Sequence, residues 1–200
     1  MSFLTNKSVG LMLIIVGLVN LIAGIGTVVA GFTDDSVDIL VAICRGIASL
    51  IFGALMLLYG IKVRGGPNDE SDIVSGLIRT LGVAIILKAI FIAIADGLDA
   101  GSITTGIWTA LAQIVIGLFL IWVSGKVGGK NKNALSKILW VILIIAFLVL
   151  AILEFVGIFN EDFGSLWGIM MAISAICMCL IYIYCFIAML SKDVKSSMGI

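Results

Sequence analysis

The chain has 200 residues, of which 62% are hydrophobic and 12% are charged, with 12 basic and 12 acidic side chains and no histidine. A net charge of zero gives no broad attraction to nucleic acid, so no nucleic-acid partner is expected. The apolar content exceeds the roughly 50% of a soluble globular domain, which excludes that class and predicts a protein whose surface meets lipid.

Six apolar runs follow one another along the chain, and each is longer than 20 residues. They cover about residues 8–31, 38–62, 73–95, 102–123, 135–158 and 166–190. A helix of roughly 20 residues crosses a hydrocarbon core of about 30 Å and pairs its own backbone groups, as lipid requires. We therefore expect an all-α integral membrane protein with six transmembrane helices, forming a single membrane domain over residues 1–200.

Glycine recurs at every seventh position in the first two runs. The first run has Gly10, Gly17 and Gly24, and the second has Gly46, Gly53 and Gly60. The third and fourth runs have small residues at the same spacing, among them Gly82 and Gly117. Seven residues make nearly two turns, so each set lies on one helix face. Small side chains let helix backbones approach closely in lipid, which predicts a packing role. The alternative is that these glycines line a narrow pore or admit a lipid tail.

The fifth run lacks such a glycine seam. Its segment ILWVILIIAFLVLAIL (138–153) is bulky on every side. We expect this helix to show much of its surface to lipid or to another membrane protein.

Basic residues lie at alternate ends of the runs. Nine of them flank the runs on one predicted side: Lys7, Lys62, Arg64, Lys126, Lys130, Lys132, Lys137, Lys192 and Lys195. The intervening turns, about 31–38, 96–102 and 159–165, are acidic and contain no lysine or arginine. The positive-inside rule then places both termini in the cytoplasm and the acidic turns outside. We expect a multi-pass protein of a cell membrane, with a prokaryotic plasma membrane as its setting.

The basic segments also predict an internal repeat. Lys62-Val63 and Lys126-Val127 are 64 residues apart, and Lys192 lies 66 residues beyond Lys126. The chain is therefore expected to consist of three tandem helical hairpins, about 7–66, 72–132 and 134–195, in a pseudo-threefold bundle. Repeats with the same topology differ from the inverted repeats of many secondary transporters.

Three tandem hairpins with glycine-rich segments such as RGIASLIFGALMLLYGIK (45–62) resemble the HdeD family of small bacterial membrane proteins. The resemblance covers nearly the whole chain, although the outer turns here lack the proline that the family often has. It implies a non-enzymatic protein associated with resistance to acid stress, acting through the bilayer or a membrane partner.

Several polar side chains lie inside the apolar runs. The candidate intramembrane polar site comprises Arg45, Lys88, Glu154, Asp96, Asn20 and Gln113. Helix rise places Arg45, Lys88 and Glu154 about 6–11 Å below the outer surface. Each ionisable residue at a helix centre costs about 2.5–3.5 kcal/mol by insertion scales, so such residues mark functional candidates.

Two interpretations of these charges remain open. In the first, each charged side chain extends separately to the membrane surface or forms one structural ion pair. In the second, the charged side chains share a small polar cavity that opens to the outside. With Arg45 and Lys88 facing one Glu154, the cavity would carry a net positive charge. It would then suit an anionic or lipid-like ligand of a small transporter or channel.

The residues of common catalytic and metal centres are missing. All four cysteines, Cys44, Cys177, Cys179 and Cys185, lie in apolar runs, and there is no histidine to accompany them. Buried cysteine then acts as a small hydrophobe, and we expect no metal, no cofactor and no enzymatic activity. A further alternative is an accessory membrane subunit of a larger complex, docked through the fifth run.

Overall fold

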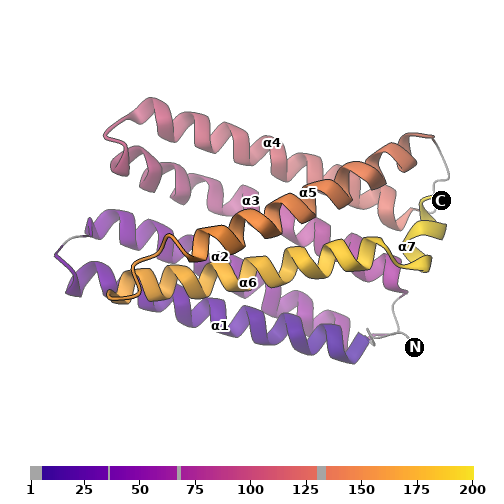
Figure 1. Ribbon diagram of the computed structural model, residues 1–200, viewed down its shortest axis with the longest axis horizontal. Coiled ribbons are helices and arrows are strands. Elements are labelled where there is room, and N and C mark those ends of the chain that lie inside the picture. Colours follow the sequence, from indigo (N-terminus) through magenta and orange to yellow (C-terminus); the bar gives the residue numbers. More distant parts are fainter. Residues whose placement is uncertain (1–5, 36, 67–68, 130–133) are drawn as a thin grey trace.

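The computed structural model describes residues 6–35, 37–66, 69–129 and 134–200. These residues form α1 (Asn6–Thr33), α2 (Ile39–Arg64), α3 (Glu70–Asp99), α4 (Ile103–Gly128), α5 (Ala134–Ile158), α6 (Leu166–Met189) and the short α7 (Lys192–Ser197) (Figure 1). The first six are long and apolar enough to cross a membrane. The prediction of an all-α membrane protein with six spanning helices is thus confirmed in its architecture.

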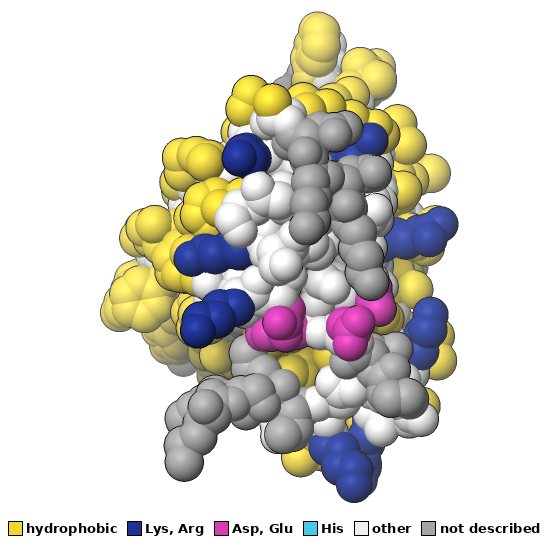
Figure 2. Space-filling model, turned by 90° about the vertical axis from the view of Figure 1, so that its right-hand side faces the viewer, with side chains coloured by type: hydrophobic (Ala, Val, Ile, Leu, Met, Phe, Trp, Pro, Cys, Tyr) yellow, Lys and Arg dark blue, Asp and Glu magenta, His cyan; other side chains and the backbone are white. Residues whose placement is uncertain are grey.

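The helices form three antiparallel hairpins with all their turns at one end. In Figure 1, α1 begins and α7 ends at the same end of the bundle, here called the terminal end. The turns at residues 34–38, 100–102 and 159–165 form the opposite end, here called the turn end. Figure 2 shows the terminal end, with lysine and arginine side chains around its rim and acidic side chains nearer its middle. The cytoplasmic location of the terminal end stays a prediction.

Side-chain caps start the helices that follow the turns. Asp38 Oδ1 accepts hydrogen bonds from the backbone N–H groups of Leu40 at 2.7 Å and Val41 at 3.3 Å. Ser165 Oγ accepts one from Gly168 N at 3.0 Å. These bonds satisfy donors that a helix start leaves unpaired, so Asp38 has a structural reason to occupy its turn.

The third helix is longer than the sequence predicts. It runs to Asp99, past the expected end at residue 95. Ala100 N donates to Asp96 O at 3.0 Å, and Gly101 then takes a φ of +59°, a conformation that favours glycine. Most of the expected 96–102 turn is therefore helix, and this brings Asp96 and Asp99 onto the helix surface.

The first two hairpins pack backbone against backbone at their glycines. A Cβ atom on Gly17 would lie 2.8 Å from Gly53 O, and one on Gly53 would lie 2.8 Å from Gly17 O. The same reciprocal approach occurs between Gly10 and Gly60, between Gly24 and Gly46, and between Gly82 and Gly117. Such distances leave no room for a side chain, so these glycines set the spacing of α1 against α2 and of α3 against α4.

The third hairpin packs differently. Helix α5 lies mainly on α6 and buries one stripe of side chains, Ser136, Leu139, Leu143, Phe147 and Ala151. Phe147 stacks on Tyr182 of α6 with ring centroids 6.3 Å apart. Residues beside this stripe, such as Trp140 and Leu150, are half-buried, and the opposite side of α5 is exposed, which contact with lipid explains. Docking of a partner protein on α5, like the equivalence of the three hairpins, stays a prediction.

The main apolar core lies toward the terminal end. Its fully buried side chains include Leu13, Met56, Leu77, Leu81, Leu143, Ile181 and Met189. Toward the turn end only a small cluster forms, with Val41, Cys44 and Ala95 buried against Phe91 and Trp167. This uneven packing leaves space between the hairpins at the turn end.

Candidate functional site

A polar cavity of about 280 Å³ occupies the turn-end half of the bundle. Side chains from α1, α2, α3, α5, α6 and the 159–165 turn line it, whereas α4 contributes none. Its polar lining consists of Asn20, Arg45, Ser49, Lys88, Asp96, Glu154, Glu161 and Ser174. A water molecule occupies about 30 Å³ in the liquid, so the cavity has room for a small ligand.

The cavity brings together five of the six polar residues that the sequence singles out: Asn20, Arg45, Lys88, Asp96 and Glu154. Gln113 does not line it, so the expectation that Gln113 joins this site is wrong. Helix α4 packs on α3, with Gly117 against Gly82, and α3 contributes to the lining where α4 does not. The Oε1 atom of Gln113 is buried and has no hydrogen-bond partner among the described residues.

Arg45 is paired at the mouth of the cavity. Its guanidinium Nη2 lies 3.5 Å from Asp96 Oδ1 and 2.5 Å from Asp99 Oδ2. The guanidinium also lies over the Trp167 ring, 5.9 Å from its centroid. These contacts join α2 to α3 and to the start of α6, and they neutralise the Arg45 charge.

Lys88 lies well below the turn-end tip of α3. It precedes the last residue of the helix, Asp99, by 11 residues, which is about 16 Å at 1.5 Å per residue, and its expected depth of 6–11 Å below the membrane surface stays a prediction. Its Nζ atom is 5.9 Å from the centroid of the Phe52 ring, a cation–π contact. No carboxylate oxygen in the described part of the chain lies within 4.0 Å of that nitrogen. The cavity floor therefore holds a cation without an ion-pair partner.

Asn20 and two serines complete the floor. Asn20 is 1% exposed, and its Oδ1 accepts a hydrogen bond from Ser174 Oγ at 2.9 Å. Ser49 Oγ lies 3.4 Å from Ser174 Oγ. The Nδ2 group of Asn20 donates to no atom of the described residues. A buried donor without an acceptor costs about 1–3 kcal/mol, so this amide is ready to bind an acceptor that enters the cavity.

Glu154 and Glu161 lie nearer the mouth. Helix rise places Glu154 about 6 Å below the end of α5, as expected. Glu161 belongs to the turn that follows α5 and also faces the cavity. Burial raises the pKa of Glu161 above its ordinary value, and the Arg45 guanidinium opposes part of that rise.

The balance of charge differs from the expected one. Three carboxylates, on Asp96, Glu154 and Glu161, and two cations, on Arg45 and Lys88, line the cavity. A net positive cavity is therefore wrong, because the longer α3 and the 159–165 turn bring in acidic groups beside Glu154. The cavity is instead divided into an acidic mouth and a floor that carries Lys88.

Sequence reasoning missed Ser49, Ser174 and Glu161 as lining residues. Ser49 follows Arg45 by four residues and precedes Phe52 by three, which places all three on one face of α2. That spacing could have predicted that Ser49 lines the cavity. No comparable pattern marks Glu161, since it lies in a turn whose path depends on the packing of the third hairpin.

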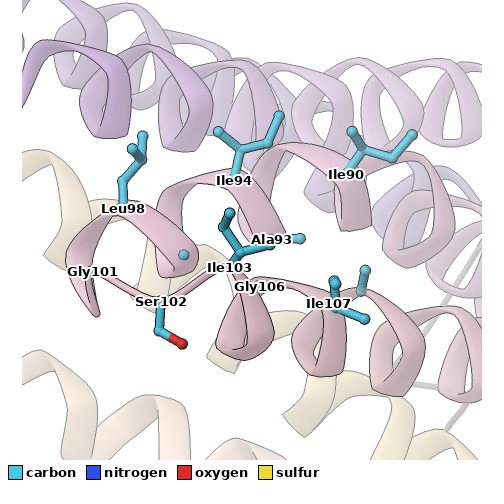
Figure 3. Close-up of a pocket in the computed structure, with 11 residues that line it drawn as sticks. Ile90, Ala93, Ile94, Leu98, Gly101, Ser102, Ile103, Gly106 and Ile107 are labelled. Carbon is cyan, nitrogen blue, oxygen red and sulfur yellow. The ribbon is translucent and has the colours of Figure 1, made fainter.

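A second hollow lies between α3 and α4 at the turn end and measures about 560 Å³ (Figure 3). Its lining is apolar apart from Ser102 and includes Ile90, Ile94, Leu98, Ile103 and Ile107. No charged side chain reaches it. It therefore offers only a surface for apolar chains, and the polar chemistry is confined to the first cavity.

Comparison with protein families, curated proteins and solved structures finds no match for this chain. The resemblance to the HdeD family stays a prediction. The function is therefore inferred from the cavity itself.

Proposed function

We propose that this multi-pass membrane protein binds a small polar ligand in the cavity and takes it from the aqueous side that the turn end faces. The observation that carries this proposal is the polar floor, where Lys88 Nζ has no carboxylate oxygen within 4.0 Å among the described residues and the buried Asn20 Nδ2 has no hydrogen-bond partner. An apolar side chain at either position would avoid the cost of placing a polar group within the membrane. A ligand that accepts hydrogen bonds from both donors offsets this cost.

Binding, and not catalysis, is proposed because, in the described part of the chain, no lining hydroxyl group forms a hydrogen bond with a lining carboxylate or amine that could activate it as a nucleophile. Neither histidine nor cysteine lines the cavity. The hydroxyl group of Ser174 donates to Asn20 Oδ1, and that of Ser49 is hydrogen-bonded to Ser174.

A carrier or receptor fits the geometry better than an open channel. The apolar core closes the terminal half of the bundle beneath the cavity, with Phe52, Met56 and Leu81 among its buried side chains. A ligand that enters from the turn end would therefore stop at the floor. The role in acid stress that the HdeD resemblance implies stays a prediction, since no feature of the cavity selects it.

Thiol labelling tests whether water and solutes reach the floor. The four native cysteines are replaced by alanine, and Ser174→Cys is then treated with a charged, membrane-impermeant methanethiosulfonate. The matched control is Ile176→Cys, whose parent side chain is 44% exposed on the outer surface of the same helix, where lipid would cover it. A thiol reacts as its thiolate, which water stabilises and lipid does not.

We expect Ser174→Cys to react at least ten times faster than Ile176→Cys. Ser49→Cys serves as a second cavity position if Ser174→Cys does not fold. Equal rates, or no reaction at either cavity position in folded protein, would contradict the proposal.

A further inference from the structure

We infer that the ligand of this cavity is a small zwitterion, with its anionic group bound by Lys88 at the floor and its ammonium group held by the carboxylates near the mouth. This inference rests on the proposed function and specifies the chemistry of its ligand. It follows from which charges are already paired within the protein and which are not.

The floor is built to receive an anionic group. Lys88 Nζ has no carboxylate oxygen within 4.0 Å among the described residues, and Asn20 Nδ2 has no acceptor. Ser49 and Ser174 add hydroxyl groups beside the amide. A carboxylate or phosphate oxygen at this place would accept hydrogen bonds from both Lys88 and Asn20.

The mouth is built to receive a cationic group. The charge of Arg45 is already balanced by Asp96 and Asp99, which both contact its Nη2 atom, although its buried Nε has no hydrogen-bond partner among the described residues. Glu154 and Glu161 also line the cavity, and neither forms an ion pair within 4.0 Å in the described part of the chain. An ammonium group there would meet two carboxylates that interact with a cation of the protein only from beyond 4.0 Å, Glu154 with Lys88 and Glu161 with Arg45.

Ligands with a single charge fit the cavity poorly. An anion would pass three carboxylates before it reached Lys88, and a cation would meet Lys88 at the floor. Like-charge contacts of this kind reject wrong ligands, so a molecule with both charges in this order is favoured.

The separation of the two binding groups selects short zwitterions. Helix rise places Glu154 about 6 Å and Lys88 about 16 Å below the ends of their helices. Lys88 and Glu154 nevertheless interact electrostatically, so the gap that a ligand must bridge is short. The volume of about 280 Å³ admits a free amino acid or the headgroup of an ethanolamine phospholipid, which share this chemistry.

Calorimetric titration tests the charge requirement. The full chain is placed in nanodiscs of phosphatidylglycerol, which supplies no zwitterionic headgroup, and titrated with glycine, β-alanine, γ-aminobutyrate and 5-aminopentanoate. Butyrate and butylamine are the matched ligands that lack one charge. We expect at least one amino acid to bind ten times more tightly than both of these controls. Butyrate or butylamine that binds as tightly as the best zwitterion would overturn the inference.

Variants test which residues bind the anionic and the cationic group of the ligand. We expect Lys88→Met and Glu154→Gln each to weaken binding at least tenfold, and Lys88→Arg to retain it. Arg79→Met removes an exposed cation from the same helix outside the cavity and should leave the affinity unchanged. Equal losses in Arg79→Met and Lys88→Met would overturn the assignment, because the effect would then follow the overall charge of α3.

Competition with phosphatidylethanolamine distinguishes a lipid headgroup from a free zwitterion as the ligand. If a headgroup is the natural occupant, phosphatidylethanolamine co-purifies with the protein, competes with γ-aminobutyrate and is lost in Lys88→Met. If the free compound is the occupant, phosphatidylethanolamine does not compete. Absence of both amino-acid binding and lipid retention overturns the inference, whereas fast labelling of Ser174→Cys would still support the proposed function.

Discussion

Charged residues in the turn-end half are of two kinds. Arg45 is neutralised by Asp96 and Asp99 and ties α2 to α3. Lys88 and Glu154 have no ion-pair partner within 4.0 Å among the described residues. An isolated charge within the membrane is costly, so a ligand that neutralises Lys88 or Glu154 binds favourably. Arg45 is already neutralised, and its contacts with α3 hold the helices around the cavity.

Sequence reasoning found most of these residues but not their pairing. Hydropathy exposes Arg45, Lys88 and Glu154, since each interrupts an apolar run. The partners of Arg45 depend on the extension of α3 to Asp99, which the acidic sequence DGLDAGS did not suggest. Gln113 was indistinguishable from Asn20 in sequence, because only tertiary packing decides which amide faces the cavity.

Glu161 should make stability depend on pH. Burial raises its pKa in the folded protein above that in the unfolded chain, so the folded state holds the proton to a higher pH. The free energy of unfolding then falls as pH rises through the window between the two pKa values. Below that window Glu161 is protonated in both states and does not lower the free energy of unfolding. We expect the melting temperature of Glu161→Gln, relative to the wild type, to be higher at pH 7 than at pH 4. Thermal unfolding in detergent measures this, and a difference independent of pH would contradict it.

Close packing of glycine gives a second prediction at the residue scale. A Cβ on Gly53 would lie 2.8 Å from both Gly17 O and Leu21 N, whereas one on Gly125 would have no atom within 4 Å. We expect Gly53→Ala to lower the free energy of unfolding by about 1–3 kcal/mol, as overpacking does. Gly125→Ala should not lower it, since alanine favours helix. Equal melting temperatures for the two variants would show that the backbones of α1 and α2 do not touch there.

At the scale of elements, the six spanning helices follow from the requirements of lipid. Each apolar run is long enough to cross, and only a helix satisfies its backbone there. The short α7 could not be predicted in this way, because KDVKSS is polar and too short to be stable alone. It is held by tertiary contacts: Ser197 Oγ donates to Val127 O at 2.9 Å, and Val194 and Met198 are buried.

The single buried stripe of α5 leads to a prediction about packing. Phe147 is 1% exposed and contacts Tyr182, while its neighbour Leu148 is 42% exposed. We expect Phe147→Ala to reduce the free energy of unfolding by about 3–5 kcal/mol, the usual cost of truncating a buried aromatic ring. Leu148→Ala faces lipid and should cost less than about 1 kcal/mol, as surface changes do. Chemical unfolding in mixed micelles measures both, and a larger loss for Leu148→Ala would indicate that α5 is rotated or covered by another subunit.

At the scale of the whole molecule, the cavity follows from unequal packing of the three hairpins. Glycine contacts draw α1 to α2 and α3 to α4, whereas α5 and α6 meet through larger side chains such as Phe147 and Tyr182 and have a less extensive contact. The main core fills the terminal half and leaves the turn-end half open between α2, α3 and α5. The sequence predicts charged residues in this half, but only the packing of the hairpins decides which helices line a shared cavity, and α4 is not among them.

Sidedness of labelling shows whether the cavity opens to the aqueous side opposite the two termini. Ser174→Cys, on the background without native cysteines, is placed in sealed vesicles with an epitope tag at the C-terminus. Vesicles are sorted by whether the tag is accessible. We expect an impermeant thiol reagent to label Ser174→Cys in vesicles whose tag is sealed inside. Labelling only in vesicles with an accessible tag would contradict it.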